Sequence, residues 1–304
     1  MKDRFTAALD AVLLDVKKDR SVLAAILCGS LAHDIVWEKS DIDLMLVTGD
    51  DRDGRFSSLA IAADSVNVHV NLLPRAEFRK VVNSAIHNSF IHSLLAKGRL
   101  LYTTDDTIRD LFERLRDVGA HDTELQLLCA ATQALPPIDK AHKWLVTRGD
   151  LEYTALWILY AATPLAAIEL LSRRLLVGRE VIPEALALNP AFFRVVYADL
   201  LNEPKSRERV AKALDAVDHY VAERAPTLFA PILDHLRDVG EARSASEIEH
   251  HFTRHGNLGD MTIACEYLAG RHLIGRASSP AKLTKRSNIE VQELAFYALD
   301  DRRR

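Results

Sequence analysis

The chain has 304 residues, of which 48% are hydrophobic, so it is long enough to bury more than one core, and two or three domains are expected. Charged residues make up 27%, the ordinary globular proportion, which argues against wholesale disorder. The net charge of −4 argues against a protein that mainly coats nucleic acid, although a local basic patch stays open.

The cysteines and the N-terminus indicate the cellular setting. Cys28, Cys129 and Cys265 are far apart and odd in number, which favours small core residues in a reducing compartment over a disulfide framework or a zinc site. The first residues lack the apolar region of a secretory leader, and no apolar run approaches the roughly 18 residues of a membrane span. The sequence therefore predicts a cytoplasmic protein with no membrane partner.

The first hundred residues have the pattern of an α/β domain. Apolar runs that stop at turn residues predict buried strands, and the alternating valines after residue 65 predict a strand with one polar face. The predicted elements are a helix over residues 5–16, strands over residues 22–28, 42–47 and 66–72, and a helix over residues 76–86.

From about residue 106 the pattern changes to helix after helix. Residues 153–162 are apolar nearly all round, which predicts the central helix of a bundle. Pro164 is expected to kink or divide that helix. The predicted helices cover residues 106–116, 122–134, 138–148, 151–175, 183–186 with 191–200, and 206–224.

A third module begins near Ser244, where Ser244 and Glu247 have the spacing of a capping box at a helix start. A second helix, two short strands and a last helix follow, in the outline of a winged helix; they are predicted over residues 260–271, 273–276, 281–284 and 289–299. The predicted fold class is α+β. An α/β domain with a mixed sheet covers residues 1–105, a helical bundle residues 106–238, and a small winged-helix-like module residues 239–304.

The strongest functional signal is a strand, a Gly-Ser turn, ten further residues and then Asp-x-Asp. Gly29 lets the backbone come close to a ligand, because it has no Cβ, and Ser30 offers its hydroxyl and amide to a phosphate. Asp41 and Asp43 are two apart on an extended strand, so both carboxylates project to one face and can hold Mg²⁺ between triphosphate oxygens. Either half of the pattern alone is common in ordinary turns, but together they favour a nucleotide site.

This pattern resembles the DNA polymerase β-like nucleotidyltransferase superfamily, and within it the kanamycin-type and antitoxin-type small transferases that carry a helical C-terminal domain. The resemblance implies that Gly29 and Ser30 bind the triphosphate and that Asp41 and Asp43 bind Mg²⁺, or Mn²⁺ in its place. It implies transfer of a nucleoside monophosphate, AMP from ATP by expectation, to a hydroxyl of a small molecule, with release of pyrophosphate. A protein acceptor is the next choice.

The sequence departs from this superfamily at the strand over residues 66–72. A third carboxylate is usual there, but the ligand-facing positions hold Asn67, His69 and Asn71. Imidazole suits softer metals than Mg²⁺, and an amide brings no charge. Three interpretations stay open: a one-metal site, a base from another domain, or a damaged enzyme. His69 is a candidate for accepting the acceptor proton, with a polar site wall as the plainer alternative.

Two further sets of residues are candidates. Lys39 and Ser40 lie beside the aspartates and are predicted to contact the nucleotide, although an exposed lysine needs no special role. The resemblance implies that the helical domain supplies a carboxylate base, and Glu152 is our choice, because apolar neighbours would raise its pKa. The alternative is that Glu152 only favours the dipole of a helix start.

A competing hypothesis is a nucleotide-sensing regulator, in which a weakened site binds the nucleotide and the C-terminal module binds DNA or a protein partner. Its support is a basic cluster that acidic neighbours dilute, so DNA is the less expected partner. The basic residues are Arg271, His272, Arg276, Lys282, Lys285, Arg286 and residues 302–304; the acidic ones are Glu290, Glu293, Asp300 and Asp301.

Overall fold

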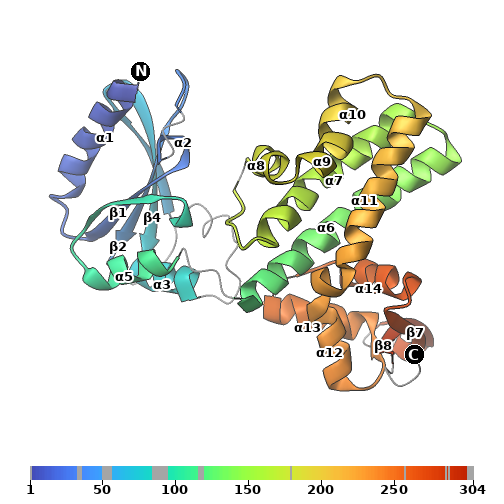
Figure 1. Cartoon of the computed structure of the whole chain (residues 1–304). Coiled ribbons are helices and arrows are strands. Elements are labelled where there is room, and N and C mark those ends of the chain that lie inside the picture. Colours follow the sequence, from blue (N-terminus) through green and yellow to red (C-terminus); the bar gives the residue numbers. More distant parts are fainter. Residues whose placement is uncertain are drawn as a thin grey trace. The chain divides into compact units, whose positions relative to one another are not determined.

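The structure is a computed structural model of the chain, in two compact units, Met1–Gly119 and Ala120–Arg304 (Figure 1). The three-domain division stays a prediction. The structure describes residues 2–32, 36–49, 57–83, 95–115, 120–178, 180–256, 258–284, 286 and 288–299.

The first unit is built on a five-stranded sheet with the order β3-β4-β2-β1-β5. Strands β2 and β4 pair in parallel and the other pairs are antiparallel, which confirms the predicted mixed sheet. The strands are β1 Val22–Cys28, β2 Ile42–Thr48, β3 Ser57–Ala63, β4 Val66–Pro74 and β5 Arg99–Thr103. Strands β3 and β5 lie at the two edges and escaped prediction, because neither carries a run of large buried residues.

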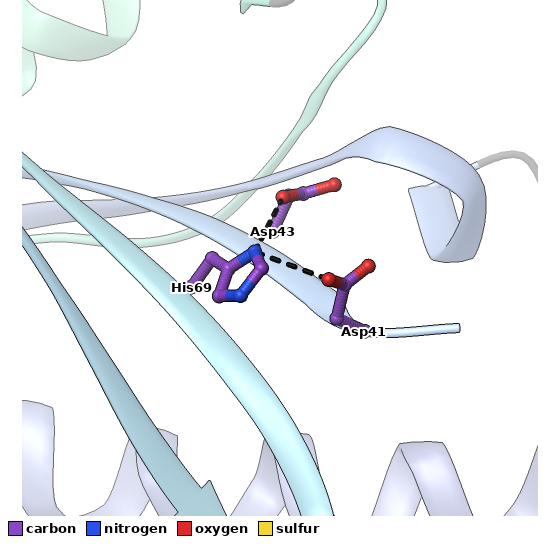
Figure 2. Close-up of side chains that lie close together, drawn as sticks. All are labelled: Asp41, Asp43 and His69. Atoms are coloured by element: carbon purple, nitrogen blue, oxygen red, sulfur yellow. Dashed lines mark ion pairs between the residues drawn. The ribbon is translucent and has the colours of Figure 1, made fainter. Parts of the chain in front are cut away.

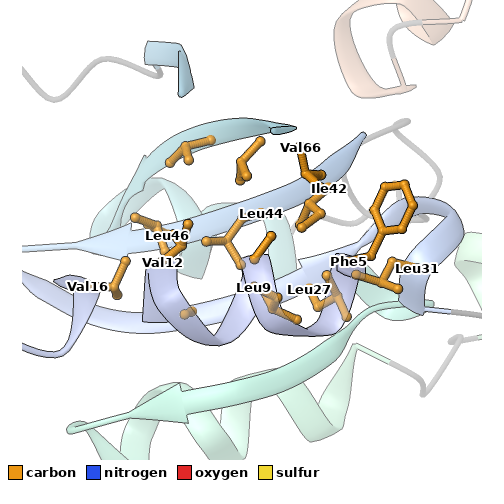
Figure 3. Close-up of a cluster of buried hydrophobic side chains, with 14 of the residues drawn as sticks. Phe5, Leu9, Val12, Val16, Leu27, Leu31, Ile42, Leu44, Leu46 and Val66 are labelled. Atoms are coloured by element: carbon orange, nitrogen blue, oxygen red, sulfur yellow. The ribbon is translucent and has the colours of Figure 1, made fainter. Parts of the chain in front are cut away.

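Helix α1, Lys2–Val16, covers one face of this sheet and forms its core (Figure 3). Phe5, Leu9 and Val12 are buried at helical spacing against apolar residues of the two central strands. On those strands the buried set is Ile42, Leu44, Leu46, Val66, Val68 and Val70. Because side chains alternate along a strand, the residues between them point to the opposite face.

The described residues include two helices beside the rest of the sheet. Helices α3, Arg75–Asn83, and α5, Asp106–Arg114, contact each other, and α3 contacts β2 and β4. Helix α3 follows the carboxyl end of β4, whereas Asp43 and His69 lie near the amino ends of β2 and β4. Both side chains therefore stay open to solvent, 35% and 49% exposed.

The second unit begins with long helices. Residues 122–134 and 138–148, predicted as two helices, form one continuous helix, α6, with Pro136 and Pro137 inside it. Packing of α6 along α7 outweighs the hydrogen bonds lost at the prolines, and Pro164 does not divide α7 either. The helices are α6 Ala120–Thr147, α7 Leu151–Leu171, α8 Val181–Leu188, α9 Pro190–Phe193, the π-helix η1 Arg194–Ala198, α10 Asp199–Asn202, α11 Arg207–Leu228 and α12 Ala230–Val239.

The sequence predicted no apolar run close to the length of a membrane span. By length and composition alone, however, helix α7 would be able to cross a membrane. Glu152 and Glu169, the charged residues of this helix, lie near its two ends. A bundle's central helix passes the same test, and 61% of the apolar window is buried inside the protein. The predicted central position of this helix agrees with that burial.

The C-terminal module differs from prediction in its strands. Residues 289–299, predicted as a helix, form strand β8, and the two short strands predicted at residues 273–276 and 281–284 are replaced by one strand, β7. Pairing with β7 along its whole length and burial of Ala295 and Phe296 outweigh the helix propensity of this segment. The elements are β6 Arg243–Ser244, α13 Ala245–Gly256, α14 Met261–Gly270, β7 Ile274–Lys282 and β8 Glu290–Ala298, in a sheet of order β6-β8-β7.

The start of α13 agrees with the predicted capping box. The Glu247 backbone N–H donates to the Ser244 hydroxyl at 3.2 Å, and the Ser244 backbone N–H donates to the Glu247 carboxylate at 2.9 Å. Helix α12 directly precedes β6 in the chain. The winged-helix-like character of the module stays a prediction.

Glu169 is a buried carboxylate in the helical unit, with 3% of its surface exposed. The Tyr220 hydroxyl donates to it at 2.7 Å, Asn189 Nδ2 donates at 3.1 Å, and the Arg173 guanidinium contacts its other oxygen. Burial alone would raise the pKa of Glu169, but these hydrogen bonds and the Arg173 charge outweigh it and hold the pKa below its ordinary value. The charged carboxylate therefore joins α7 to α11 and to the start of α9.

We expect Glu169→Ala to destabilise the helical unit by about 3 kcal/mol, because it leaves buried donors and the Arg173 charge without their acceptor. Tyr220→Phe removes one of these hydrogen bonds and should cost about 1.5 kcal/mol. Urea unfolding measures both changes.

Fluorescence isolates this unit, since Trp144 and Trp157 belong to it and the third tryptophan, Trp37, can be replaced by Phe. The matched control is Glu203→Gln on an exposed residue, which should leave the free energy of unfolding unchanged within about 0.5 kcal/mol. A Glu169→Ala protein as stable as this control would contradict the assigned role of the carboxylate.

His142 on α6 and Asp218 on α11 form an ion pair in the same unit, with Nε2 2.7 Å from Oδ2. The hydrogen bond from His142 to Asp218 raises the pKa of the imidazole. Burial opposes that rise, and the charges of Asp218, Asp139 and Asp215 add to it.

Because the folded-state pKa of His142 is raised, its stabilisation is complete below the unfolded-state pKa of about 6.5 and is lost as the pH rises through the folded-state value. We expect Tm to fall as the pH rises above about 6.5, and to fall less steeply in His142→Ala. The side chain is 43% exposed, so solvent screening keeps the effect to a few degrees at most. Thermal unfolding at low salt measures it; His250→Ala, on an exposed histidine, should keep the wild-type slope.

Candidate functional site

Strand register brings three polar side chains together at one end of the first unit's sheet. Asp41 directly precedes β2, and the parallel pairing of β2 with β4 places Asp43 beside His69. The antiparallel pairing of β2 with β1 places Asp43 opposite Cys28, the last residue before Gly29. Two strands and a turn thus converge on one group of side chains (Figure 2).

The three side chains point toward one another (Figure 2). His69 Nδ1 lies 3.1 Å from Asp41 Oδ2 and 3.9 Å from Asp43 Oδ1. One potential ligand atom from each residue lies within 4.8 Å of the other two, and no other group within the described ranges is arranged in this way. The side chains are 43%, 35% and 49% exposed, so a ligand can reach them.

This donor set fits a divalent cation. Two adjacent carboxylates repel each other, and a cation between them removes that repulsion. Ligand distances of about 2.1 Å place neighbouring ligands of an octahedral ion about 3 Å apart and opposite ligands about 4.2 Å apart. The separations between His69 and the two carboxylates fall in this interval. Asp41, Asp43 and His69 are therefore the residues that would hold a metal.

Gly29 is required by the shape of the turn that ends β1. Its φ is +65°, in the left-handed region that favours glycine, and a Cβ there would overlap the Asp43 carboxylate. One helical turn follows, α2, Gly29–Ala32, which buries Leu31 and carries Ser30. The turn therefore brings the backbone at Gly29 close to the Asp43 carboxylate, with Ser30 as the next residue.

Cys28 directly precedes this turn and lies opposite Asp43 in the sheet, where its side chain is buried. Burial raises the pKa of the Cys28 thiol to about 12, and the nearby Asp43 charge adds to the rise. The protonated Sγ donates weakly toward the Ile26 carbonyl oxygen at 3.9 Å. All three cysteines are free, and Cys28 and Cys265 are buried, as the sequence predicts.

The remaining predicted residues of the first unit lie around this group. Ser40 closes the turn before Asp41, because its hydroxyl accepts the Trp37 backbone N–H and its own N–H donates to the Trp37 carbonyl, both at 3.0 Å. Lys39 is exposed. Their nucleotide contacts stay predictions. Asn67 and Asn71 share the polar face of β4, but the register places His69, and neither asparagine, beside Asp43.

Glu152 belongs to the second unit. It is exposed in the first turn of α7, where the Asp150 carboxylate caps the helix by accepting the Tyr153 backbone N–H at 2.8 Å. The sequence predicted that Glu152 would be buried among apolar neighbours, but the buried carboxylate of this helix is Glu169. The Glu169 carboxylate already accepts hydrogen bonds from within the unit. The role of Glu152 as a base stays a prediction.

Comparison with known proteins agrees with this site. Residues 15–107 match the family described as polymerase beta, nucleotidyltransferase. The chain is similar to the crystal structure of a nucleotidyltransferase-like protein from Exiguobacterium sibiricum 255-15, with a TM-score of 0.64, 15% sequence identity, and 96% of this chain and 99% of that chain covered. No curated protein matches the chain significantly in sequence.

These findings confirm the resemblance to the polymerase β-like superfamily. Residues 15–107 form a nucleotidyltransferase domain of that superfamily, and they contain the Gly29 turn and all three members of the Asp41–Asp43–His69 group. The structural likeness extends the shared fold over nearly the whole chain.

We expect Gly29→Ala to abolish metal-dependent nucleotide binding, because its Cβ displaces the Asp43 carboxylate. The left-handed backbone adds a stability cost of about 1 kcal/mol. Gly240→Ala is the matched control, since Gly240 has a φ of +71° and open space around its Cβ. Calorimetric titration with a non-hydrolysable nucleotide and metal should show wild-type binding in Gly240→Ala and none in Gly29→Ala; equal binding would contradict the role of Gly29.

Proposed function

We propose that the chain transfers a nucleoside monophosphate, AMP from ATP in the first instance, to a hydroxyl group of a small molecule. The observation that carries the proposal is the convergence of Asp41, Asp43 and the Gly29 turn within a polymerase β-type nucleotidyltransferase domain. A protein hydroxyl is the next candidate acceptor.

Different residues of the site would bind the triphosphate and the metal. Gly29 and Ser30 would hold the triphosphate, since a phosphate oxygen can approach the backbone where no Cβ intervenes. Asp41, Asp43 and His69 would hold a divalent metal, Mg²⁺ or Mn²⁺, which when bound neutralises charge on the phosphates. Lys39 and Ser40 would add contacts from the preceding turn.

The transfer itself is a substitution at the α-phosphorus. The acceptor oxygen forms a bond to that phosphorus, the bond to the bridging oxygen breaks, and pyrophosphate leaves. The acceptor proton passes to a base, and Glu152 of the helical unit is the base that we propose. Alignment of the acceptor with the leaving group contributes most of the rate in reactions of this kind.

A regulator that binds nucleotide without turnover is the second candidate, favoured by the imidazole of His69 among the ligands. Its DNA-binding form has less support. Arg276 pairs with Glu266 at 3.0 Å, and the Arg271 guanidinium lies over the Tyr267 ring at 5.0 Å, so both contact their own module. Lys285 and residues 302–304 lie outside the described residues. The proposed setting is the cytoplasm, which suits the free thiols.

We expect wild-type protein to release pyrophosphate from an α-³²P-labelled nucleotide in the presence of divalent metal and a hydroxyl acceptor. Asp41→Asn should lower this rate at least about a hundredfold, the scale of losing one group that stabilises developing charge. The matched control is Asp64→Asn, on the turn between β3 and β4, where a φ of +46° also suits asparagine.

The label identifies the acceptor class. Label transferred to small hydroxyl compounds supports the first choice, and label retained on protein supports the second. Tight nucleotide binding without pyrophosphate release from any acceptor class would establish the regulator instead.

A further inference from the structure

We propose that the Asp41–Asp43–His69 group binds a first-row transition-metal ion, represented by Mn²⁺, in preference to Mg²⁺, through direct ligation by His69 Nδ1. The inference rests on the proposed function for its setting, but metal binding tests it separately. His69 adds an imidazole nitrogen to the two carboxylates of Asp41 and Asp43, so the donor set is not made of oxygen alone.

The fold of the sheet holds the His69 imidazole beside the two carboxylates. Parallel pairing sets His69 beside Asp43, and burial of Val68 and Val70 on the α1 side turns the ring to the polar face. Nδ1, and not only the ring edge, faces both carboxylates (Figure 2). In the neutral tautomer that carries its proton on Nε2, the ring offers the Nδ1 lone pair to the region that the two carboxylate oxygens face.

Donor chemistry then decides the ion. Mg²⁺ prefers oxygen ligands, gives up its water reluctantly and gains little from an imidazole nitrogen. Affinity for nitrogen rises from Mn²⁺ along the first row, while Mn²⁺ still accepts carboxylates readily. Two carboxylates with a neutral imidazole carry one negative charge fewer than three carboxylates, which weakens the electrostatic binding on which Mg²⁺ depends.

The surroundings exclude a softer site. A thiolate ligand would favour zinc or copper, and Cys28 is the cysteine opposite Asp43 in the sheet. Its thiol is buried and directed toward the Ile26 carbonyl oxygen. The donor set is thus mixed oxygen and nitrogen, which suits ions between Mg²⁺ and the thiolate-binding metals.

Pulsed electron paramagnetic resonance of bound Mn²⁺ tests direct ligation, because it detects the coupling of a coordinated ¹⁴N nucleus. We expect this coupling in the wild-type protein and its loss in His69→Asp and His69→Gln. Calorimetric titrations of the metals alone should show His69→Gln losing at least about tenfold in Mn²⁺ affinity. His69→Asp should shift the Mn²⁺-to-Mg²⁺ affinity ratio toward Mg²⁺ by about tenfold or more.

The matched control is Asn71→Asp, which adds a carboxylate to the same face of β4, two residues from His69 and beside Met45 instead of Asp43. It should keep the ¹⁴N coupling and the wild-type affinity ratio, so a shift in both variants would show a general charge effect and overturn the proposal. Circular dichroism establishes that each variant is folded, as expected for substitutions of exposed or half-buried side chains.

Two results overturn the proposal: Mn²⁺ bound without ¹⁴N coupling, or Mg²⁺ bound as tightly as Mn²⁺ by the wild-type protein. The first would mean that His69 only donates a hydrogen bond to Asp41. Failure of nucleotidyl transfer gives a different signature, since Mn²⁺ selectivity and ¹⁴N coupling would then persist without pyrophosphate release.

Discussion

Burial of one face of the sheet against α1 is the constraint on which the position of the site depends. The central strands carry Ile42, Leu44, Val66 and Val68 toward the helix, and each of these residues is at most 1% exposed. Side chains alternate, so a shift of one residue in either strand would expose this core and bury the site. The apolar residues therefore fix the direction of Asp43 and His69 as firmly as their own contacts do.

Register supplies what alternation alone does not. Alternation puts Asn67, His69 and Asn71 on one face, and only the pairing of β4 with β2 selects the residue beside Asp43. The β1 turn then brings Gly29 against the same carboxylate, where no other residue has room. A nucleotide site of this type is thus built from short segments far apart in the chain and held by backbone hydrogen bonds.

Local patterns predicted the central strands around the candidate site, whereas pairing between distant segments was predicted poorly. Gly29, Ser30, Asp41 and Asp43 were singled out because their signal lies within one short segment; the structure brings Gly29 against Asp43, and their roles stay predictions. The capping box at Ser244 also lies within one short segment, and it is present in the structure. Strand β8 was mistaken for a helix, since nothing in the segment itself reveals that β7 pairs with it. Helix α6 was divided at its two prolines, because its packing along α7 is invisible locally.

The buried thiol beside the site has a consequence for the protein's behaviour under oxidative stress. Oxidants and alkylating reagents attack the thiolate form, and Cys28 is kept protonated by its apolar surroundings and by the Asp43 charge. The thiol at the end of β1 is therefore in its less reactive, protonated form. Oxidants and cysteine-directed electrophiles, which react with thiolates, should therefore modify Cys28 slowly in the folded protein.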